Sequence, residues 1–290
     1  MNPSIHSRME ALIEALPYLQ KYRGQTFVIK YGGSAMEDDQ VVARMLQDVV
    51  FLEAVGINPV LIHGGGKAIT SRMKEAGIGA RFVNGLRVTD AASIGIVEEV
   101  LDQVINPGIV DHLNRSGGRA VGIPGKRVMF GRKLPPQKEG DALVDLGFVG
   151  EVLEVRLTEV ERAIEAEAVP VISPLASDES GVSLNINADI AAGFIAGGLC
   201  AAKMIYLSDV PGLMRNPSDP QTLISSVNRA QIGQLVSEGV IAGGMLPKVD
   251  SALNALQRGV RKVHFIDGRV PHALLMEVFT KAGIGTEIIN

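Results

Sequence analysis

Two clusters of glycine each follow directly after a short apolar run that is typical of a β-strand. Gly32 and Gly33 come after residues 28–31, and residues 64–66 are three glycines that come after residues 60–63. Because glycine has no Cβ, backbone N–H groups can approach an anion closely, and a helix that begins at the glycines adds the positive end of its dipole. The clusters therefore predict a site for an anion such as phosphate. Two tight turns between strand and helix are the alternative interpretation.

Neither glycine cluster has the spacing of a standard nucleotide-binding motif. Leu61 and Ala68 stand where a P-loop requires a glycine and a Ser or Thr. Ile69 stands where a dinucleotide-binding fingerprint requires its third glycine. The glycines therefore indicate a phosphate site of another kind.

Two lysines are placed where they could bind the same anion. Lys30 ends an apolar run two residues before Gly32, so its ammonium group can reach an anion bound at the glycines. A solvent-facing lysine at a strand end is the alternative. Lys248 follows Gly243 and Gly244 at the start of an expected helix, where a cation opposes the helix dipole unless an anion compensates.

Further polar residues follow other expected strands. Arg87 lies between a turn and the start of a helix, and its planar guanidinium group suits a carboxylate, although most loop arginines are simply solvated. Residues 185–189 hold Asn185, Asn187 and Asp189, which is more than one helix cap requires. Since ligands of α/β sheets bind at the carboxyl ends of the strands, we expect these residues to lie near one another.

The elements that must position these residues alternate along the chain. Strand-like runs alternate with helical patterns, which predicts an α/β fold with a mainly parallel sheet covered by helices on both faces. The strands are expected at residues 26–30, 59–63, 119–123, 169–173, 204–208, 262–266 and 286–289. Helices are expected at residues 39–54, 91–113, 189–199, 249–257 and 273–280, and others begin near residues 8, 159 and 229.

Local signals mark helix starts and a surface segment. Ser7, Thr158 and Asn228 each precede a Glu or Gln by three residues, the spacing of a capping box. Residues 125–150 are polar and contain prolines, so we expect a surface excursion with a hairpin. A weak boundary near residues 173–180 divides the chain into two lobes that share one sheet.

Composition excludes several classes of protein. The chain has 290 residues, 46% of them hydrophobic, and a formal net charge of −4, which argues against a nucleic-acid partner. The single cysteine, Cys200, cannot form an internal disulfide, and we expect it to be reduced, buried and in the cytoplasm. No uncharged run reaches the roughly 18 residues that cross a bilayer, and no signal peptide is apparent, so no membrane association is expected.

Taken in order, these motifs resemble the amino-acid kinase family. The resemblance runs from about Ala15 to Ile289 and includes residues 28–33, 63–66, 84–89, 185–189, 207–213 and 243–249. It implies a three-layer α/β/α sandwich that uses ATP to phosphorylate the side-chain carboxylate of N-acetyl-L-glutamate in arginine biosynthesis. The segment Asn84-Gly85-Leu86-Arg87-Val88-Thr89 resembles this branch more than relatives that act on carbamate, aspartate or uridylate.

The resemblance also implies roles for individual residues. Lys30 and Lys248 would be catalytic, and Asp189 would hold both lysines in place. The acyl substrate would be bound by Gly65, Gly66, Arg87 and Asn185, and ATP by Gly33, Asp209, Val210, Gly212, Leu213, Gly243 and Gly244. Residues 25–175 would form the lobe for the acyl substrate, and residues 176–290 the lobe for ATP.

The expected chemistry needs neither a general base nor a protein-bound metal. A carboxylate with a reference pKa near 4.3 is already ionised at neutral pH, so positioning and charge stabilisation suffice. Mg²⁺ would arrive on the ATP phosphates, because the sequence shows no carboxylate cluster or histidine spacing for a metal site.

The two chain ends resemble a branch of the family that arginine inhibits and that assembles as hexamers. The helix within residues 1–24 would mediate assembly, and Tyr18, His272 and Glu277 would lie near the bound arginine. An ordinary amphipathic surface helix is the alternative for the first segment. A PII signalling protein is a further partner that the resemblance raises.

Two departures and three alternative functions remain. Lys67 stands where the family often has proline, and Asn106-Pro107 replaces a more usual Asn-Lys, which would reshape a helix near the active site. The alternatives are a kinase for carrier-linked aminoadipate, a catalytically silent protein that responds to arginine or PII, and a nicotinamide-binding protein. The complete Arg87 segment, the retained catalytic residues and the missing third glycine argue against them in turn.

Overall fold

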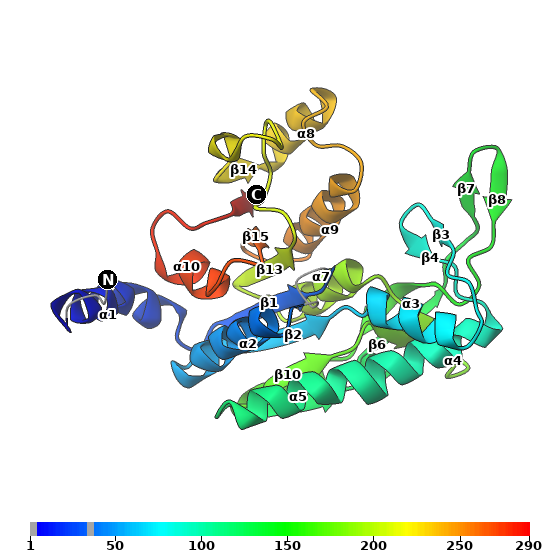
Figure 1. Ribbon diagram of the computed structural model, residues 1–290, viewed down its shortest axis with the longest axis horizontal. Coiled ribbons are helices and arrows are strands. Elements are labelled where there is room, and N and C mark those ends of the chain that lie inside the picture. The colour runs from blue at the N-terminus through cyan, green and yellow to red at the C-terminus, as the bar shows by residue number, and fades with distance from the viewer. Residues whose placement is uncertain (1–4, 34–37) are drawn as a thin grey trace.

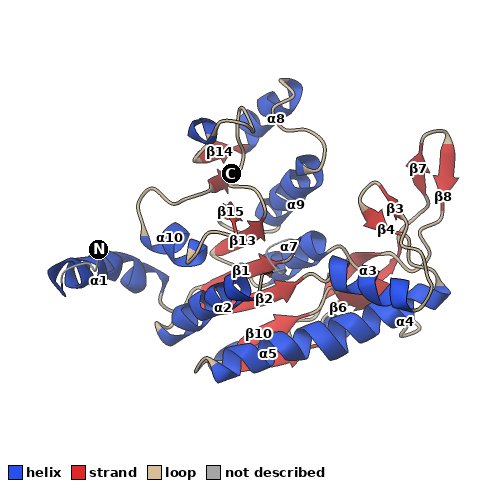
Figure 2. Cartoon of the chain, in the orientation of Figure 1, coloured by secondary structure: helices blue, strands red, loops and turns tan. Residues whose placement is uncertain are grey.

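A mainly parallel sheet runs through both halves of the chain. The structure, a computed structural model, describes residues 5–33 and 38–290, and Figures 1 and 2 show helices packed around the sheet. Within this described part, the largest sheet has eight strands in the order β14-β16-β15-β13-β1-β2-β10-β5. Its neighbouring strands are parallel except for β15 and β16. The bounds are β1 (Thr26–Tyr31), β2 (Asn58–His63), β5 (Ala120–Ile123), β10 (Val169–Ile172), β13 (Lys203–Ser208), β14 (Ser226–Asn228), β15 (Val263–Asp267) and β16 (Thr286–Ile289).

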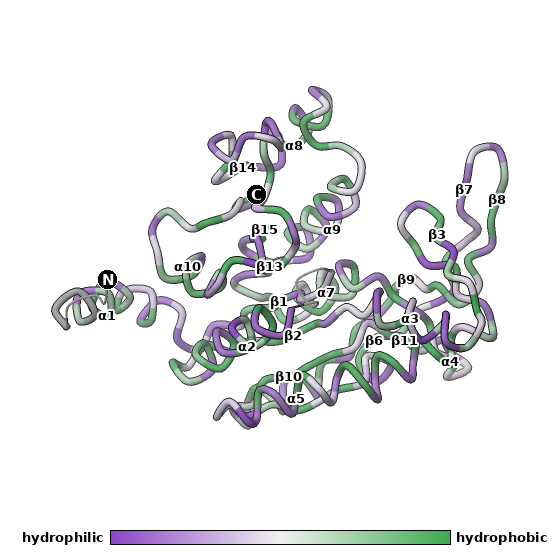
Figure 3. The backbone as a smooth tube through the Cα atoms, viewed as in Figure 1, coloured by the Kyte–Doolittle hydropathy of each residue, from purple (hydrophilic) through white to green (hydrophobic). Residues whose placement is uncertain are grey.

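Helices bury both faces of this sheet. One face carries α6 (Thr158–Glu165), α7 (Ala188–Gly198), α8 (Arg229–Ser237) and α9 (Met245–Gln257), and the other carries α2 (Asp39–Ala54), α5 (Asn106–Arg115) and α10 (Ala273–Phe279). Figure 3 shows mainly hydrophobic strands between helices that alternate in hydropathy. The expected three-layer α/β/α sandwich is therefore confirmed.

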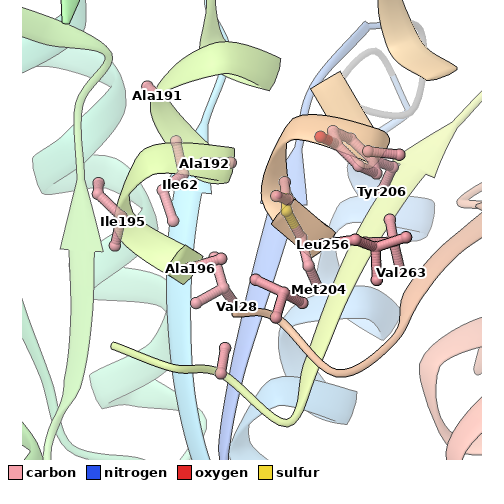
Figure 4. Close-up of a cluster of buried hydrophobic side chains, with 14 of the residues drawn as sticks. Val28, Ile62, Ala191, Ala192, Ile195, Ala196, Met204, Tyr206, Leu256 and Val263 are labelled. Atoms are coloured by element: carbon pink, nitrogen blue, oxygen red, sulfur yellow. The ribbon is translucent and has the colours of Figure 1, made fainter. Parts of the chain in front are cut away.

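The two-residue period of a strand decides which layer each side chain joins. In β1, Val28 packs with α7 and α9, whereas Phe27, Ile29 and Tyr31 pack with the helices of the opposite layer. Figure 4 shows Val28 beneath the small side chains of α7. Because Lys30 lies two residues after Val28, it emerges on the α7 side of the sheet.

Each strand expected from the sequence is present, but a second sheet was not foreseen. The surface hairpin consists of β7 (Gln137–Glu139) and β8 (Ala142–Val144). Its flanks form strands β6 (Met129–Lys133) and β9 (Gly150–Val155), which join β11 (Leu175–Ser177) and β12 (Ser183–Asn185) in the order β12-β11-β6-β9. The sequence did not predict β6, because the polar side chains at the end of this strand are exposed and interrupt the apolar pattern of a buried strand.

The local cap predictions succeeded only in part. Asn228 caps α8 with the expected capping box. Ser7 lies inside α1 (Ile5–Tyr22), and Thr158 is already the first residue of α6, so both of those predictions were wrong. The three-residue spacing alone does not say where a helix begins.

Cys200 is exposed rather than buried, because it lies in a turn after α7 with a φ of 47°.

One long helix is irregular at its centre. α4 (Ala91–Glu98), a π-helical stretch η2 (Glu99–Ile105) and α5 follow one another without a break, as Figure 1 shows. The π stretch ends at Ile105, two residues before Pro107, whose ring would clash with the carbonyl four residues earlier in a regular α-helix. The wider π turn accommodates the proline without ending the helix.

Helix α1 stands at one end of the molecule and contacts α10 (Figure 1). It exposes four large apolar side chains: Met9, Leu12, Ile13 and Leu16. Residues 1–4 of the segment expected to mediate assembly lie outside the described residues. None of the described helices is long and apolar enough to cross a membrane.

Candidate active site

A cleft of about 720 Å³ opens at the carboxyl ends of β1 and β2, where the two glycine clusters meet. The strands are neighbours in parallel register, with Tyr31 opposite His63. A Cβ on Gly32 would lie 3.3 Å from the Gly64 Cα atom, so the two loops touch backbone to backbone. The glycines are therefore required for close packing, and Gly33, Gly65 and Gly66 all line the cleft.

Lys30 and Asp189 line this cleft, and Lys248 lies beside Asp189, so that the three residues come together from three elements. Asp189 lies in the first turn of α7, which the Asn187 side chain caps. The Asp189 carboxylate is 2.9 Å from the Lys30 Nζ atom and 3.7 Å from the Lys248 Nζ atom. Two lysines thus share one carboxylate, and the group keeps a net positive charge.

The electrostatics of Asp189 keep it ionised. Burial by itself would raise the pKa of this carboxyl group, but the charges and hydrogen bonds of Lys30 and Lys248 outweigh burial and hold the pKa below its ordinary value. Asp189 can therefore hold both lysines across the neutral pH range. The net positive charge that remains suits an anionic ligand.

Buried hydrogen bonds support α7 from below. The Ser251 Oγ atom donates to the Asp189 backbone carbonyl at 2.9 Å and bonds the Tyr206 hydroxyl group at 2.8 Å. Because Ser251 lies on α9, these bonds fasten the helix of Lys248 to the helix of Asp189. Sequence reasoning missed Ser251 and Tyr206, since nothing local distinguishes them from other core residues.

Arg87 lies against the second glycine loop with only 7% of its surface exposed. Its Nη2 atom donates to the Gly66 carbonyl oxygen at 2.6 Å and to the Thr70 hydroxyl group at 2.8 Å. The Phe82 ring lies 4.7 Å from the Arg87 Cζ atom. Burial lowers the pKa of Arg87, but guanidinium remains charged at neutral pH. This rigid cation lines the cleft together with its loop.

Arg87 and Phe82 belong to a small hairpin of β3 (Phe82–Val83) and β4 (Leu86–Arg87), which faces α3 (Gly66–Glu75) across the cleft. Asn185 also lines the cleft, and its side chain donates to the Thr89 hydroxyl group at 3.0 Å. Of the expected residues, two of the catalytic three and all four for the acyl substrate therefore line the cleft, and Lys248 joins them through Asp189 without lining it.

The residues expected to bind ATP are more dispersed. Gly33 and Asp209 line the cleft, whereas Val210, Gly212, Leu213, Gly243 and Gly244 are not among its lining residues. The Leu213 amide donates to the Thr286 hydroxyl group at 2.8 Å, and a Cβ on Gly212 would collide with that hydroxyl. Gly212 and Leu213 thus have a packing role in the structure, and their contact with ATP stays a prediction.

The donor set does not favour a protein-bound metal at this cleft. Among residues 5–33 and 38–290, no group of three or more His, Cys, Asp or Glu side chains is arranged to hold a metal ion. The Asp189 carboxylate is already engaged by two ammonium groups.

A second, smaller cavity of about 360 Å³ lies between α1, α10 and β15. Tyr18 and Glu277 line it, as do Lys203 and His264, which sequence reasoning missed. The Lys203 Nζ atom is 2.8 Å from the His264 Nε2 atom, and the His264 Nδ1 atom is 2.6 Å from the Glu277 carboxylate. Burial lowers the pKa of Lys203 to about 8.

His272, the third residue expected here, is not among the residues that line this cavity. His272 lies at the start of α10, and its Nδ1 atom is 2.7 Å from the carboxylate of Asp48 on α2. The sequence offers no signal for His264 or Lys203, because His264 lies within an expected strand and Lys203 is the residue just before one.

Comparison with known proteins agrees with this geometry. The family model described as "Amino acid kinase family" matches residues 25–267. The chain belongs to the amino acid kinase family. The resemblance noted in the sequence and the expected fold are thereby confirmed.

Several similar amino acid kinases are named acetylglutamate kinase. That of Akkermansia muciniphila is 51% identical over 280 residues, which cover 96% of this chain and 94% of the relative. That of Synechococcus elongatus (strain ATCC 33912 / PCC 7942 / FACHB-805) is 47% identical and covers 98% and 92%. That of Methanocaldococcus jannaschii is 47% identical and covers 97% and 96%.

Solved structures show the same amino acid kinase architecture. An N-acetylglutamate synthase from Neisseria gonorrhoeae, complexed with coenzyme A and N-acetyl-glutamate, superposes with a TM-score of 0.84 and 27% identity over 97% of this chain. This chain spans 63% of the length of that synthase. Giardia carbamate kinase, at 17% identity, a TM-score of 0.66 and coverage of 92% and 99%, shares the fold.

Proposed function

We propose that this chain is an acetylglutamate kinase that transfers the γ-phosphoryl group of ATP to the side-chain carboxylate of N-acetyl-L-glutamate. An oxygen of the carboxylate forms the new bond to phosphorus, the bond between the γ-phosphorus and the bridging oxygen breaks, and ADP leaves. The products are ADP and N-acetyl-L-glutamyl 5-phosphate, an intermediate of arginine biosynthesis. The observation that carries the proposal is the pairing of Lys30 and Lys248 with one buried carboxylate beside a glycine-lined cleft.

Each residue role follows from charge and position. Lys30 and Lys248 stabilise the negative charge on the transferring group, and Asp189 keeps the two ammonium groups in place. Gly65 and Gly66 supply backbone N–H donors. Arg87 binds a substrate carboxylate, and Asn185 binds the polar groups of the acylated amino acid.

We assign the acyl substrate to residues 25–175 and ATP to residues 176–290. The contacts of Arg87 with the second glycine loop support the first assignment, and Asp209 and Lys248 support the second. Gly33, Val210, Gly212, Leu213, Gly243 and Gly244 complete the assigned nucleotide contacts. Mg²⁺ bound to the ATP phosphates would neutralise part of their charge.

We further propose that L-arginine inhibits the enzyme from the second cavity. The carboxylates of Glu277 and Glu287 suit a guanidinium or ammonium group, and Lys203 suits a carboxylate. We assign Tyr18 and Glu277 to this site, with His272 acting through the start of α10. The exposed apolar face of α1 supports assembly into a hexamer. Binding of a PII signalling protein and a cytoplasmic location are proposals that rest on the family resemblance and the single cysteine.

The test is ATP-dependent formation of an acyl phosphate, trapped with hydroxylamine. N-Acetyl-L-glutamate should be preferred over glutamate, aspartate and aminoadipate, and Lys248→Ala should abolish the product. Lys126→Ala is the matched control, because Lys126 also pairs with a carboxylate, but with that of Glu98 rather than that of Asp189. No product from N-acetyl-L-glutamate, with the protein folded and ATP bound, would refute the assigned substrate.

A further inference from the structure

His63 lies buried beneath the second glycine loop and has no part in the chemistry described so far. It is the last residue of β2 and is 0% exposed. Its Nδ1 atom lies 2.9 Å from the Gly64 carbonyl oxygen, and its Nε2 atom lies 3.3 Å from the Nδ2 atom of the Asn106 amide. Both ring nitrogens are therefore engaged, one by the loop and one by α5.

The hydrogen bonds of Asn106 determine which ring nitrogen carries the proton. The Asn106 Nδ2 atom also lies 2.9 Å from the Val171 carbonyl oxygen, which can only accept, so the amide nitrogen must face this side. Its two hydrogens then serve Val171 and the His63 Nε2 atom. Nε2 is consequently the unprotonated nitrogen, and Nδ1–H donates to Gly64.

The imidazole is neutral in this environment. Burial lowers the pKa of His63 to about 4, so a single tautomer with one N–H group is present at neutral pH.

A bond to the Gly64 carbonyl also orients the Gly65 amide. The two groups belong to one planar peptide unit, and no cis peptide bond occurs among the described residues. In a trans peptide the C=O and N–H bonds point in opposite directions. Holding the Gly64 carbonyl toward buried His63 therefore turns the Gly65 N–H away from the core. Gly65 lines the cleft, and a glycine pair without such a restraint could rotate.

The π-helical turn before Pro107 brings Asn106 to this position. The Asn106 backbone N–H bonds the Leu101 carbonyl five residues earlier, the spacing of a π turn. From the same turn, Leu101 and Ile105 pack on Gly65, where a Cβ would lie 2.6 and 2.9 Å from their terminal methyl carbons. This irregular turn thus holds the loop by apolar contact and by the amide of Asn106.

We propose that Asn106 and His63 are positioning residues for phosphoryl transfer: Asn106 sets the tautomer of His63, and His63 aims the Gly65 N–H into the cleft. The proposal rests on the proposed function, in which Gly65 donates to the substrate or the transferring group. Neither side chain touches the reacting atoms.

The tautomer can be measured without any turnover. In protein labelled with ¹⁵N-histidine, long-range ¹H–¹⁵N correlation distinguishes Nδ1–H from Nε2–H, and His63→Gln identifies the signal. We expect Nδ1–H in the wild type. In Asn106→Asp the carboxylate cannot donate, so the proton should move to Nε2 or the ring should become doubly protonated. An Nε2–H tautomer in the wild-type protein would overturn the proposal.

Kinetics then test whether the tautomer matters for transfer. Asn106→Asp and Asn106→Leu should each lower kcat by about 10- to 100-fold, which is a smaller fall in kcat than complete removal of one oxyanion-hole donor causes. KM for ATP should change less than about twofold. Asn114→Ala is the matched control, because Asn114 lies on the same helix and bonds the backbone of Ala120 away from the loop. A folded Asn106 variant with an altered tautomer and wild-type kcat would overturn the proposal. Absence of acyl phosphate with the wild-type enzyme would instead refute the proposed function and leave the tautomer result standing.

Discussion

Replacing Asp189 with asparagine tests the central electrostatic arrangement. Asp189→Asn keeps the shape of the side chain and removes the charge shared by Lys30 and Lys248. The side chains of the two lysines are 10% and 24% exposed, so water can replace little of the lost interaction at Lys30 and somewhat more at Lys248. Removing one partner of a buried ion pair costs about 3–5 kcal/mol, and the exposure of Lys248 favours the lower end.

A loss of about 3 kcal/mol corresponds to a fall in Tm of roughly 5–10 °C for a chain of this size. We also expect kcat to fall about 100-fold or more, because two unscreened ammonium groups repel each other and leave the positions that stabilise the transferring phosphoryl group. The hydroxylamine assay measures kcat, and thermal unfolding measures Tm.

A non-hydrolysable ATP analogue provides the sharper test of this reasoning. Its phosphates supply the negative charge that the variant lacks, so the analogue should raise the Tm of Asp189→Asn at least as much as that of the wild type. Asp111→Asn is the matched control, because Asp111 pairs with Arg115 at 3.0 Å on the surface and should cost less than about 1 kcal/mol. Wild-type Tm and kcat in Asp189→Asn would refute the shared-carboxylate argument.

Three further predictions address other parts of the structure. Arg87→Lys cannot bond Gly66, Thr70 and a carboxylate in the same planar arrangement, so KM for N-acetyl-L-glutamate should rise about tenfold with KM for ATP unchanged; equal changes in both would contradict the assignment. Because burial lowers the pKa of Lys203 to about 8, the unfolded chain retains a proton that the folded protein has lost between about pH 8 and 10.4, so stability should rise over this range and Lys203→Met should remove the rise. Urea unfolding at several pH values checks this, and an unchanged slope in the variant would refute it. Leu12→Asp places a charge on the exposed face of α1 and should reduce the assembly measured by light scattering, with acyl-phosphate formation retained; an unchanged assembly would refute the role of that face.

The sequence by itself determined the parts of this protein that depend on neighbours along the chain. Hydrophobic runs of strand length, helical periodicity and glycines after strands are local signals, and they located the strands of the main sheet apart from β14, the covering helices and the two loops of the cleft. The Asn228 cap was visible for the same reason, since a cap bonds residues two or three positions away, whereas the sequence left open which polar residue of 185–189 caps α7, and the structure shows Asn187. Ser7 and Thr158 show the limit of that reasoning, because equal spacing can occur inside a helix.

Only the tertiary structure decided which distant groups share a charge or a proton. Three residues far apart in the sequence, Lys30, Asp189 and Lys248, meet because α7 and α9 pack on the face of the sheet from which Lys30 of β1 emerges. His264 lies inside an expected strand and Lys203 just before another, and only packing places both beside Glu277 in a cavity. Likewise, Pro107 and its expected effect on the helix come from the sequence, but the link to the glycine loop requires the contact between Asn106 and His63. Hydrogen bonds and ion pairs fall off steeply with distance, so their partners are known only once the fold has brought the atoms together.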